Sequence, residues 1–247
     1  MLGEPERTSY DLNFSFFGFP VRVHPLFWLV AVLLGARGAD PPAILIWVVA
    51  MFAAIFVHEL GHAVTMRAYG FYPWIVLYGM GGLASYDPSS GRGRRISGWR
   101  NIAISFAGPL AGFLLAAAIV IALIASGNGE RVEFDGLFGI QPVVRGLARV
   151  RVAQFLNDML LMCFYWGLVN LLPIYPLDGG HIAREVFAMA DPRRGLRGSL
   201  ILSFVAATVM AAVGAVLWRS ILTAVFFGYL AYGSYTMLQS MSGRDRW

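Results

Sequence analysis

Six apolar stretches, separated by segments that carry arginines, constrain the fold of this 247-residue chain more than any other feature. Five of them approach or exceed the roughly 18–20 residues that a helix needs to cross a hydrocarbon core about 30 Å thick. We predict six membrane helices, one for each stretch. Because the first stretch is shorter, five helices are the alternative. The stretches are Leu26–Ala36, Ala43–Met66, Ile102–Ala125, Val152–Leu172, Leu200–Trp218 and Ile221–Leu238.

The composition excludes a water-soluble enzyme. Hydrophobic residues make up 58% of the chain and charged residues 13%, whereas soluble domains contain roughly 45–50% and about 25%. Intrinsic disorder is excluded as well, because disordered chains combine low hydrophobicity with high charge. We therefore predict an all-α polytopic membrane protein with about six transmembrane helices.

The positive charges are all arginines, and their distribution predicts the orientation of the chain. There are 19 arginines against 14 acidic residues. With six crossings, both termini, residues 67–100 and residues 184–197 share one side and carry 13 arginines. Arginine-rich loops stay in the cytoplasm, so we expect both termini to be cytoplasmic, although three arginines on the other side, at positions 145, 149 and 151, oppose this orientation. The basic excess indicates topology and not nucleic-acid binding.

The chain reads as a single membrane-embedded domain over residues 1–247. We expect a core at residues 43–180, C-terminal helices at residues 198–239 and no appended soluble domain. The longest non-apolar segments, residues 67–100 and 126–151, are too short to fold alone. We expect the protein to reside in a bacterial or archaeal cell membrane, and the sequence gives no indication of its oligomeric state.

The second apolar stretch contains the pentad His58-Glu59-Leu60-Gly61-His62. Histidines four residues apart project from the same face of a helix, so both imidazoles can bind one Zn²⁺ with the glutamate beside them as general base. Ionisable side chains are expensive inside a membrane and mark functional sites by default. The pentad therefore predicts a metal centre rather than a polar helix-pairing cluster.

A catalytic zinc takes three protein ligands and leaves one position for water. Carboxylates in or near the membrane helices are Asp158, Asp178 and Glu185. In the predicted topology His58 lies near the cytoplasmic end of its helix, at the depth where the fourth helix ends just before Asp178. Two prolines and two glycines surround Asp178, which indicates irregular backbone of the kind tolerated at membrane depth where protein or water satisfies it. We therefore choose Asp178 as the third ligand.

These residues together resemble the site-2 protease family of intramembrane zinc metalloproteases. The resemblance rests on the His58-Glu59-Leu60-Gly61-His62 pentad and on the run from Asn170 through Pro173, Pro176 and Leu177 to Asp178-Gly179-Gly180. It implies one zinc per chain, bound by His58, His62 and Asp178, with Glu59 as catalytic base. It further implies that Asn170 positions the substrate or polarises the reacting carbonyl.

Two further segments match the family less strongly. Ala107-Gly108-Pro109-Leu110-Ala111-Gly112 is similar to a small-residue motif of the family, and by itself it indicates close helix packing with a proline kink. Residues 71–86 predict a strand, a glycine-rich turn and a second strand between the second and third helices. The resemblance implies that this hairpin dips into the membrane, and its free edge, at Gly81 and Gly82, can pair with an extended substrate. An interfacial aromatic loop is the alternative.

We predict an intramembrane zinc metalloprotease that acts on single-pass membrane proteins in regulated intramembrane proteolysis. The resemblance implies this activity, and the predicted topology places the active site near the cytoplasmic side of the lipid bilayer. The alternative is a membrane zinc-binding protein or carrier without proteolysis, against which Glu59 argues, because a binder needs no base. His181 is either a hydrogen-bonding partner of Asp178 or Glu59, or an ordinary loop residue.

Overall fold

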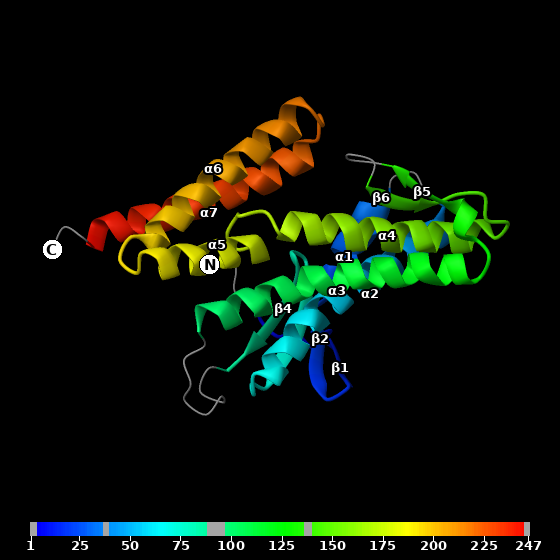
Figure 1. Cartoon of the computed structure of the whole chain (residues 1–247), viewed down its shortest axis with the longest axis horizontal. Helices are drawn as coiled ribbons and strands as arrows, with labels where there is room; N and C mark the ends of the chain where they lie inside the picture. The colour runs from blue at the N-terminus through cyan, green and yellow to red at the C-terminus, as the bar shows by residue number, and fades with distance from the viewer. Residues whose placement is uncertain (1–3, 37–39, 88–96, 136–139, 245–247) are drawn as a thin grey trace. The chain divides into compact units, whose positions relative to one another are not determined.

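A computed structural model of the chain describes residues 4–36, 40–87, 97–135 and 140–244 (Figure 1). Most of these residues are helical, and the strands are short. The elements in chain order are β1 (Leu12–Phe16), β2 (Phe19–Val23), α1 (Pro25–Gly35), α2 (Pro41–Ala68), β3 (Pro73–Tyr78), β4 (Gly81–Tyr86), α3 (Gly98–Ala125), the 3-10 turn η2 (Gly129–Arg131), β5 (Val132–Asp135), β6 (Gln141–Val144), α4 (Val150–Asn170), α5 (Asp178–Ala190), α6 (Gly195–Val216) and α7 (Ile221–Arg244).

Five helices within the described residues are long and apolar enough to cross a membrane: α2, α3, α4, α6 and α7. Each begins and ends within a few residues of an apolar stretch in the sequence, so the membrane-protein class is confirmed. The first apolar stretch forms α1, which has 11 residues and spans only about 16 Å at ~1.5 Å per residue. As a helix alone it is too short to cross, and the predicted count of six spanning helices is not reached.

The described residues divide into two compact units. The first, here called the strand-bearing unit, joins residues 4–87 to 107–168. The second, here called the C-terminal unit, joins residues 97–106 to 169–244. The boundary between the units falls inside α3 and at the end of α4.

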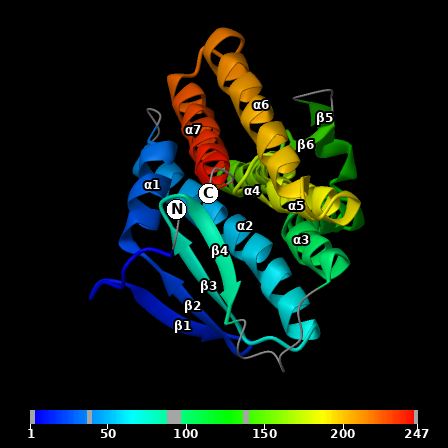
Figure 2. The same cartoon turned by 90° about the vertical axis from the view of Figure 1, so that its left-hand side faces the viewer.

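A four-stranded sheet with the order β1-β2-β3-β4 lies in the strand-bearing unit (Figure 2). β1 and β2 form one antiparallel hairpin and β3 and β4 another, and β2 pairs with β3 in parallel. Parallel neighbours need a crossover connection, which α1 and α2 supply. The crossover places α2 against β3 and β4.

The core of this unit lies between the sheet and the helices α1 and α2. Phe27 of α1, Ile55 of α2, and Ile75 and Leu77 of β3 are completely buried. Ile75 and Leu77 of β3 belong to this core, and Val76 between them is completely buried on the other face, so both faces of the strand are covered here. This packing fixes the hairpin β3–β4 beside the middle of α2.

The all-α prediction was too narrow. Residues 71–86 form the expected pair of strands, but β1 and β2 extend them to four strands, and β5 and β6 form a second, two-stranded sheet. The aromatic and β-branched residues of Leu12–Val23 favour strands, and pairing with β3 satisfies backbone groups that a helix would satisfy internally. The sheet is therefore part of the membrane-protein fold, and the membrane depth of the hairpin remains a prediction.

The C-terminal unit consists of the helical hairpin α6–α7 and the shorter helix α5. A small apolar core around Ile174, Ala207, Phe227 and Leu230 holds it together. Residues 184–197 were expected to form a loop between membrane helices, yet α5 covers Asp178–Ala190 and α6 begins at Gly195. Pro173 and Pro176 end the preceding helix, as predicted, and a new helix starts directly after them.

Candidate metal centre

The two histidines of the pentad lie one turn apart on α2, with their imidazole nitrogens together. Nε2 of His58 and Nε2 of His62 are 3.3 Å apart, and the two rings are inclined at 78°. Both side chains are buried, with 3% and 6% of their surface exposed, and Glu59 between them is 4% exposed. Three ionisable side chains are thus removed from solvent within a single helical turn.

The spacing of the two nitrogens fits a zinc ion. Zinc lies about 2.0–2.1 Å from each imidazole nitrogen in tetrahedral sites, which places two such nitrogens about 3.3 Å apart. The distance between the two Nε2 atoms is 3.3 Å. The residues present therefore match half of a tetrahedral zinc site in both chemistry and geometry.

Gly108 of α3 lies directly against these two nitrogens. A Cβ atom at this position would be 2.2 Å from Nε2 of His62 and 2.8 Å from Nε2 of His58. It would therefore occupy the space of a metal ion bound to both imidazole nitrogens. The sequence indicated only helix packing for this motif, and Gly108 is a site residue that sequence reasoning missed.

The same helix pair explains how the glycine comes so close. Gly61 of α2 faces the carbonyl oxygen of Ala107, and a Cβ atom at Gly61 would lie 2.4 Å from it. Small residues let helices approach closely in membranes. Gly61 and Gly108 together bring α2 and α3 into backbone contact at the level of the histidines.

The hairpin β3–β4 reaches the glutamate of the pentad, Glu59. A Cβ atom on Gly82 would lie 2.4 Å from Oε1 of Glu59, so a side chain at this position would displace the carboxylate of Glu59. Gly81 has a φ of +119° and lies against the ring of Trp166 on α4. Of the two glycines named from the sequence, Gly82 thus lies against the pentad and Gly81 against Trp166, a residue that had no signal in the sequence.

The outer edge of the hairpin presents backbone groups beside Glu59. The carbonyl oxygen of Leu77 accepts a hydrogen bond from the backbone N–H of His24 at 2.8 Å, so the backbone of Leu77 faces the β2 side. In an antiparallel pair the partner of such a residue turns its own backbone outward. The partner is Gly82, and two residues further along Ala84 is oriented in the same way. Among the described strands β4 pairs only with β3.

Tyr78, at the turn of the hairpin, faces the same region. Burial raises the pKa of its phenol above the ordinary value, and the negative charge of Glu59 raises it further. Tyr78 therefore stays protonated at neutral pH and keeps a hydrogen-bond donor near the pentad.

Asp178 begins α5 in the C-terminal unit. An acidic side chain in the first turn of a helix is stabilised by the helix dipole. The two residues that follow must be glycines: a Cβ on Gly179 would lie 2.2 Å from the carbonyl oxygen of Leu171, and one on Gly180 would lie 2.5 Å from the backbone of Ile174 and Tyr175. The first turn of α5 is therefore packed directly onto the loop that precedes it.

Two buried serines hold this loop. The hydroxyl of Ser203 on α6 accepts a hydrogen bond from the backbone N–H of Tyr175 at 2.7 Å, and it contacts the hydroxyl of Ser234 on α7 at 2.7 Å. Both serines are 1% exposed. The hairpin α6–α7 thus fixes the backbone that leads to Asp178, a connection that the sequence did not predict.

The remaining candidate residues lie on several elements. Asn170 is the last residue of α4, and the imidazole of His181 packs against the ring of Tyr175 at 5.2 Å between centroids. Glu185 accepts a hydrogen bond from Asn101 at 3.2 Å. Asp158 lies in the first half of α4, where one of its carboxylate oxygens is buried without a hydrogen bond from any described residue.

A helix able to cross a membrane, carrying a buried His-Glu-x-x-His turn with zinc-compatible spacing, defines a membrane metallopeptidase type of site. The chain belongs to peptidase family M50, the site-2 protease family, whose model matches residues 46–213. The family resemblance that the motifs predicted is confirmed. The chain is thus an integral membrane protein of a zinc metalloprotease family.

Two curated relatives match over a similar length. A zinc metalloprotease of Methanocaldococcus jannaschii is 28% identical over 185 residues, which cover 73% of this chain and 46% of the relative. A protein of Synechocystis is 28% identical over 186 residues, covering 70% of this chain and 42% of the relative. The chain spans about half the length of the curated relatives it matches.

A solved structure from the same archaeon shares the fold. The site-2 protease from Methanocaldococcus jannaschii superposes with a TM-score of 0.56 at 23% sequence identity. The match covers 93% of this chain and 95% of that chain. The likeness therefore extends over nearly the whole of both chains.

Proposed function

We propose that this chain is an intramembrane zinc metalloprotease that hydrolyses peptide bonds in or near the transmembrane segments of membrane proteins. The observation that carries the proposal is the pair of buried imidazole nitrogens 3.3 Å apart, with Glu59 in the same turn of a membrane-spanning helix. A pure metal carrier needs the two histidines but has no use for the glutamate between them.

His58, His62 and Asp178 are the proposed ligands of one zinc ion. They offer two imidazole nitrogens and one carboxylate oxygen, the ligand types that catalytic zinc takes from proteins. The packed first turn of α5 supports the assignment of Asp178, since Gly179, Gly180 and the Ser203 hydrogen bond hold its backbone firmly. A ligand held in this way loses little conformational entropy on binding a metal.

Glu59 is the proposed general base. Zinc, when bound, supplies a Lewis acid that polarises the scissile carbonyl and acidifies the attacking water. Glu59 takes the proton of this water and returns it to the departing amine. The close contact with Gly82 holds the carboxylate in place, and Tyr78 offers a protonated hydroxyl in the same region.

The free edge of β4 is the proposed docking site of the substrate. A transmembrane helix hides its own amides and must unwind before it is cleaved. Once unwound, it can pair as an added strand with the outward backbone groups of Gly82 and Ala84. Such a strand runs past Glu59, because Gly82 contacts that residue. Asn170 then positions the reacting carbonyl.

The proposed topology keeps six crossings, of which the first is composite. β2 has five residues and α1 has eleven, and they follow each other with only His24 between them. At about 3.3 Å per strand residue and 1.5 Å per helical residue they extend together over roughly 33 Å, enough for a core of about 30 Å, and the charge of Arg22 within this crossing is paired with Asp11 and Glu4. The parallel pairing of β2 with β3 supports this assignment, since α2 must return over the same distance. Both termini are then cytoplasmic, and the active site lies near that side.

The decisive experiment measures cleavage and bound zinc together. The full chain is reconstituted in liposomes with a dye-labelled single-span peptide whose apolar segment contains a central glycine–asparagine pair, which eases unwinding. Wild type is compared with Glu59→Gln, His58→Ala and Asp178→Ala. We expect Glu59→Gln to keep its zinc and to lose cleavage by a factor of about 10²–10⁴, because only the proton transfer is removed. The two ligand variants should lose zinc and activity together.

Each alternative predicts a different result. Cleavage by Glu59→Gln at the wild-type rate would exclude the proposed mechanism. A wild-type protein that holds zinc and cleaves no peptide of a panel varied around the central pair would be a membrane zinc-binding protein or carrier. Undiminished zinc in Asp178→Ala would transfer the third ligand to another residue.

A further inference from the structure

The start of β4 contacts two helices at once. Gly82 lies against Glu59 of α2, and the neighbouring Gly81 lies against Trp166 of α4. A Cβ atom on Gly81 would be 2.6 Å from Cζ2 and 2.7 Å from Cη2 of the indole. The indole of Trp166 therefore occupies the space directly beside Gly81, one residue along β4 from the contact with Glu59.

The packing of α4 on α3 fixes the direction of this indole. A Cβ atom on Gly112 would lie 3.3 Å from the carbonyl oxygen of Cys163, and one on Gly167 would lie 2.8 Å from the ring of Phe113. The two glycines let the helices approach closely, so α4 is not free to rotate about its own axis. The position of Trp166 thus belongs to the helix packing, and its side chain is only partly buried.

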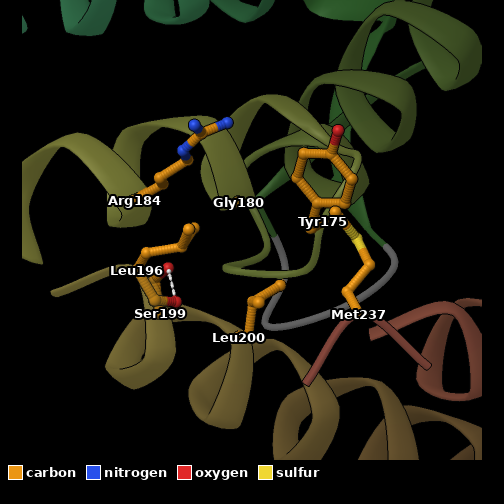
Figure 3. A pocket seen from close by; sticks show the side chains of 7 residues that line it. All are labelled: Tyr175, Gly180, Arg184, Leu196, Ser199, Leu200 and Met237. Carbon is orange, nitrogen blue, oxygen red and sulfur yellow. Dashed lines mark hydrogen bonds between the residues drawn. The ribbon is translucent and has the colours of Figure 1, made fainter. Parts of the chain in front are cut away.

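Two other hollows of the described chain are unsuited to holding a substrate side chain beside Glu59. The crevice between α5, α6 and α7 in the C-terminal unit (Figure 3) has room for about one water molecule. A shallow apolar groove of about 670 Å³, including the open space at its mouth, is lined by residues near the start of α2 and α4. Its lining residue nearest to Glu59 along α2 is Val49, ten residues or about 15 Å away. Neither hollow therefore selects a side chain at the reacting bond.

A substrate strand on the edge of β4 comes within reach of Trp166. In the proposed docking it pairs with the outward backbone groups of Gly82 and Ala84. Because β4 begins at Gly81, the next substrate residue lies at the very end of β4, about 3.3 Å beyond the residue opposite Gly82. Side chains on neighbouring strands are about 5 Å apart, within reach of an aromatic ring. The indole that contacts Gly81 is therefore positioned to touch this substrate residue.

We propose that Trp166 is a specificity-determining residue that selects a large apolar side chain, such as phenylalanine or leucine, next to the reacting bond; the inference rests on the proposed function. Because Glu59 contacts Gly82, the reacting bond lies beside that residue, and the selected side chain is its neighbour on the Gly81 side. A large apolar side chain covers the indole, and an aromatic one adds a ring contact. Asn170 follows Trp166 by four residues, so both lie on the same face of α4.

The test compares rates of cleavage within a set of matched peptides. The full chain in liposomes receives single-span peptides in which the positions next to the cleaved bond, on either side, carry phenylalanine, leucine, alanine or serine. Mass spectrometry identifies the cleaved bond, and kcat/KM is measured for each peptide. Wild type is compared with Trp166→Ala and Trp166→Phe, and with Phe155→Ala as the matched control, which removes another partly buried ring from α4. Bound zinc and circular dichroism show that each variant keeps its metal centre and its helices.

At one of these positions we expect wild type and Phe155→Ala to cleave the phenylalanine peptide about tenfold faster than the alanine peptide. Trp166→Ala should keep its zinc and cleave the two at nearly equal rates, and Trp166→Phe should give an intermediate ratio.

A ratio in Trp166→Ala equal to that of wild type would overturn the inference, even if all its rates are lower, because a merely structural role lowers them uniformly. A preference of wild type for alanine, or a ratio lost equally in Phe155→Ala, would overturn it as well. If Trp166→Ala does not fold, a wild-type ratio in Trp166→Phe has the same consequence. Cleavage by Glu59→Gln at the wild-type rate, or a wild type that cleaves no peptide, would instead refute the proposed function and this inference with it.

Discussion

At the scale of single residues, the absence of a side chain at Gly108 matters as much as the histidines it faces. Nitrogens of the two imidazoles lie 2.2 and 2.8 Å from the place where a Cβ atom would be. Replacing glycine with alanine inside a helix ordinarily stabilises it by about 1 kcal/mol. At Gly108 the same change is favourable for the helix but places a methyl group in the metal centre, so its effects on helix stability and on metal binding have opposite signs.

We expect Gly108→Ala to lose bound zinc almost completely while the helices stay folded. The added methyl group occupies the space of the metal, and α2 and α3 are too closely packed at Gly61 to move apart. Zinc per chain, measured by mass spectrometry of the purified protein, checks this prediction. Gly112→Ala, one turn further along α3, is the control: its Cβ would meet the carbonyl oxygen of Cys163 at 3.3 Å and should leave zinc unchanged. Full zinc occupancy in Gly108→Ala would contradict the proposed position of the metal.

The residues of the pentad could be predicted from the sequence, because their chemistry is carried by their spacing along one helix. Gly82 could be named only because of the resemblance to a known family. Gly108 and Trp166 could not be assigned to the site, since their roles depend on how α3 and α4 are rotated about their own axes. Rotation of a buried helix leaves little trace in a sequence that is apolar on all sides.

At the scale of elements, the outer edge of β4 determines how a substrate can be presented. The outward N–H groups of Gly82 and Ala84 are the donors that an added strand needs. Exposed strand edges pair readily with other chains, and proteins usually block them. Among the strands that the structure describes, none covers the outer edge of β4 beside Glu59, so this edge can accept an added strand.

We expect Ala84→Pro to lower cleavage of a transmembrane peptide about tenfold, with bound zinc unchanged. Proline removes the outward N–H and thereby one hydrogen bond to the substrate strand, but the bonds between β3 and β4 remain. Ala84→Val keeps the N–H and adds bulk, so it should retain most of the activity. Equal rates for Ala84→Pro and Ala84→Val in the liposome assay would exclude strand pairing at this position.

An ion cluster around Arg22 holds the amino-terminal segment on the four-stranded sheet. Arg22 is 6% exposed and pairs with Asp11 at 2.9 Å and with Glu4 at 2.7 Å. The hydroxyl of Thr8 and the guanidinium of Arg22 lower the pKa of Asp11 from 3.8 to about 2. Because the folded pKa is depressed, this stabilisation is present above pH 4 and is lost as the pH falls towards 2.

Thermal unfolding between pH 5 and pH 2 tests this ion cluster. The midpoint of wild type should fall as Asp11 is protonated. Asp11→Asn should be less stable than wild type at neutral pH. Its unfolding midpoint should fall less steeply between pH 5 and pH 2, because no carboxylate at position 11 is protonated. Identical pH profiles for the two proteins would mean that Asp11 does not couple folding to pH.

The helices were predictable from the sequence because a long apolar run inside a membrane must satisfy its own backbone hydrogen bonds, and a helix does so locally. The parallel pairing of β2 with β3 could not be predicted in the same way. The two strands are separated by about fifty residues and two helices, and no local pattern in either strand specifies the other as its partner. The start of α5 at Asp178 was hidden for a different reason, because two prolines just before it indicated an irregular segment.

At the scale of the whole molecule, the number of crossings decides on which side of the membrane each loop lies. In the proposed topology, with its composite first crossing, both termini share one side, which we propose is the cytoplasm, and the α6–α7 turn lies on the opposite side. A crossing count of five would place the amino terminus outside. The orientation of the entire protein thus depends on how a strand of five residues and a helix of eleven are combined.

Two reporters are used, one that is active only in the cytoplasm and one that is active only on the outer side of the membrane. After residue 247 we expect the cytoplasmic reporter to be active. A reporter inserted after Arg219, between α6 and α7, should be active only in its form for the outer side. The same pair of fusions at the amino terminus should match the result at residue 247. If the reporter after residue 247 is active on the outer side, the proposed orientation is inverted. If the two termini give opposite results, the composite crossing is wrong.

The short helix α1 has a consequence for the lipid around the protein. Its 11 residues cover only about half of a typical hydrocarbon core. The neighbouring strand keeps its backbone groups satisfied by β1 and β3, but it does not offer lipid the uniform apolar surface of a helix. Hydrophobic mismatch of this kind compresses the adjacent bilayer at a cost of fractions of a kcal/mol per Å. We therefore expect the membrane to be thinnest beside α1, where water reaches furthest towards the centre of the bilayer.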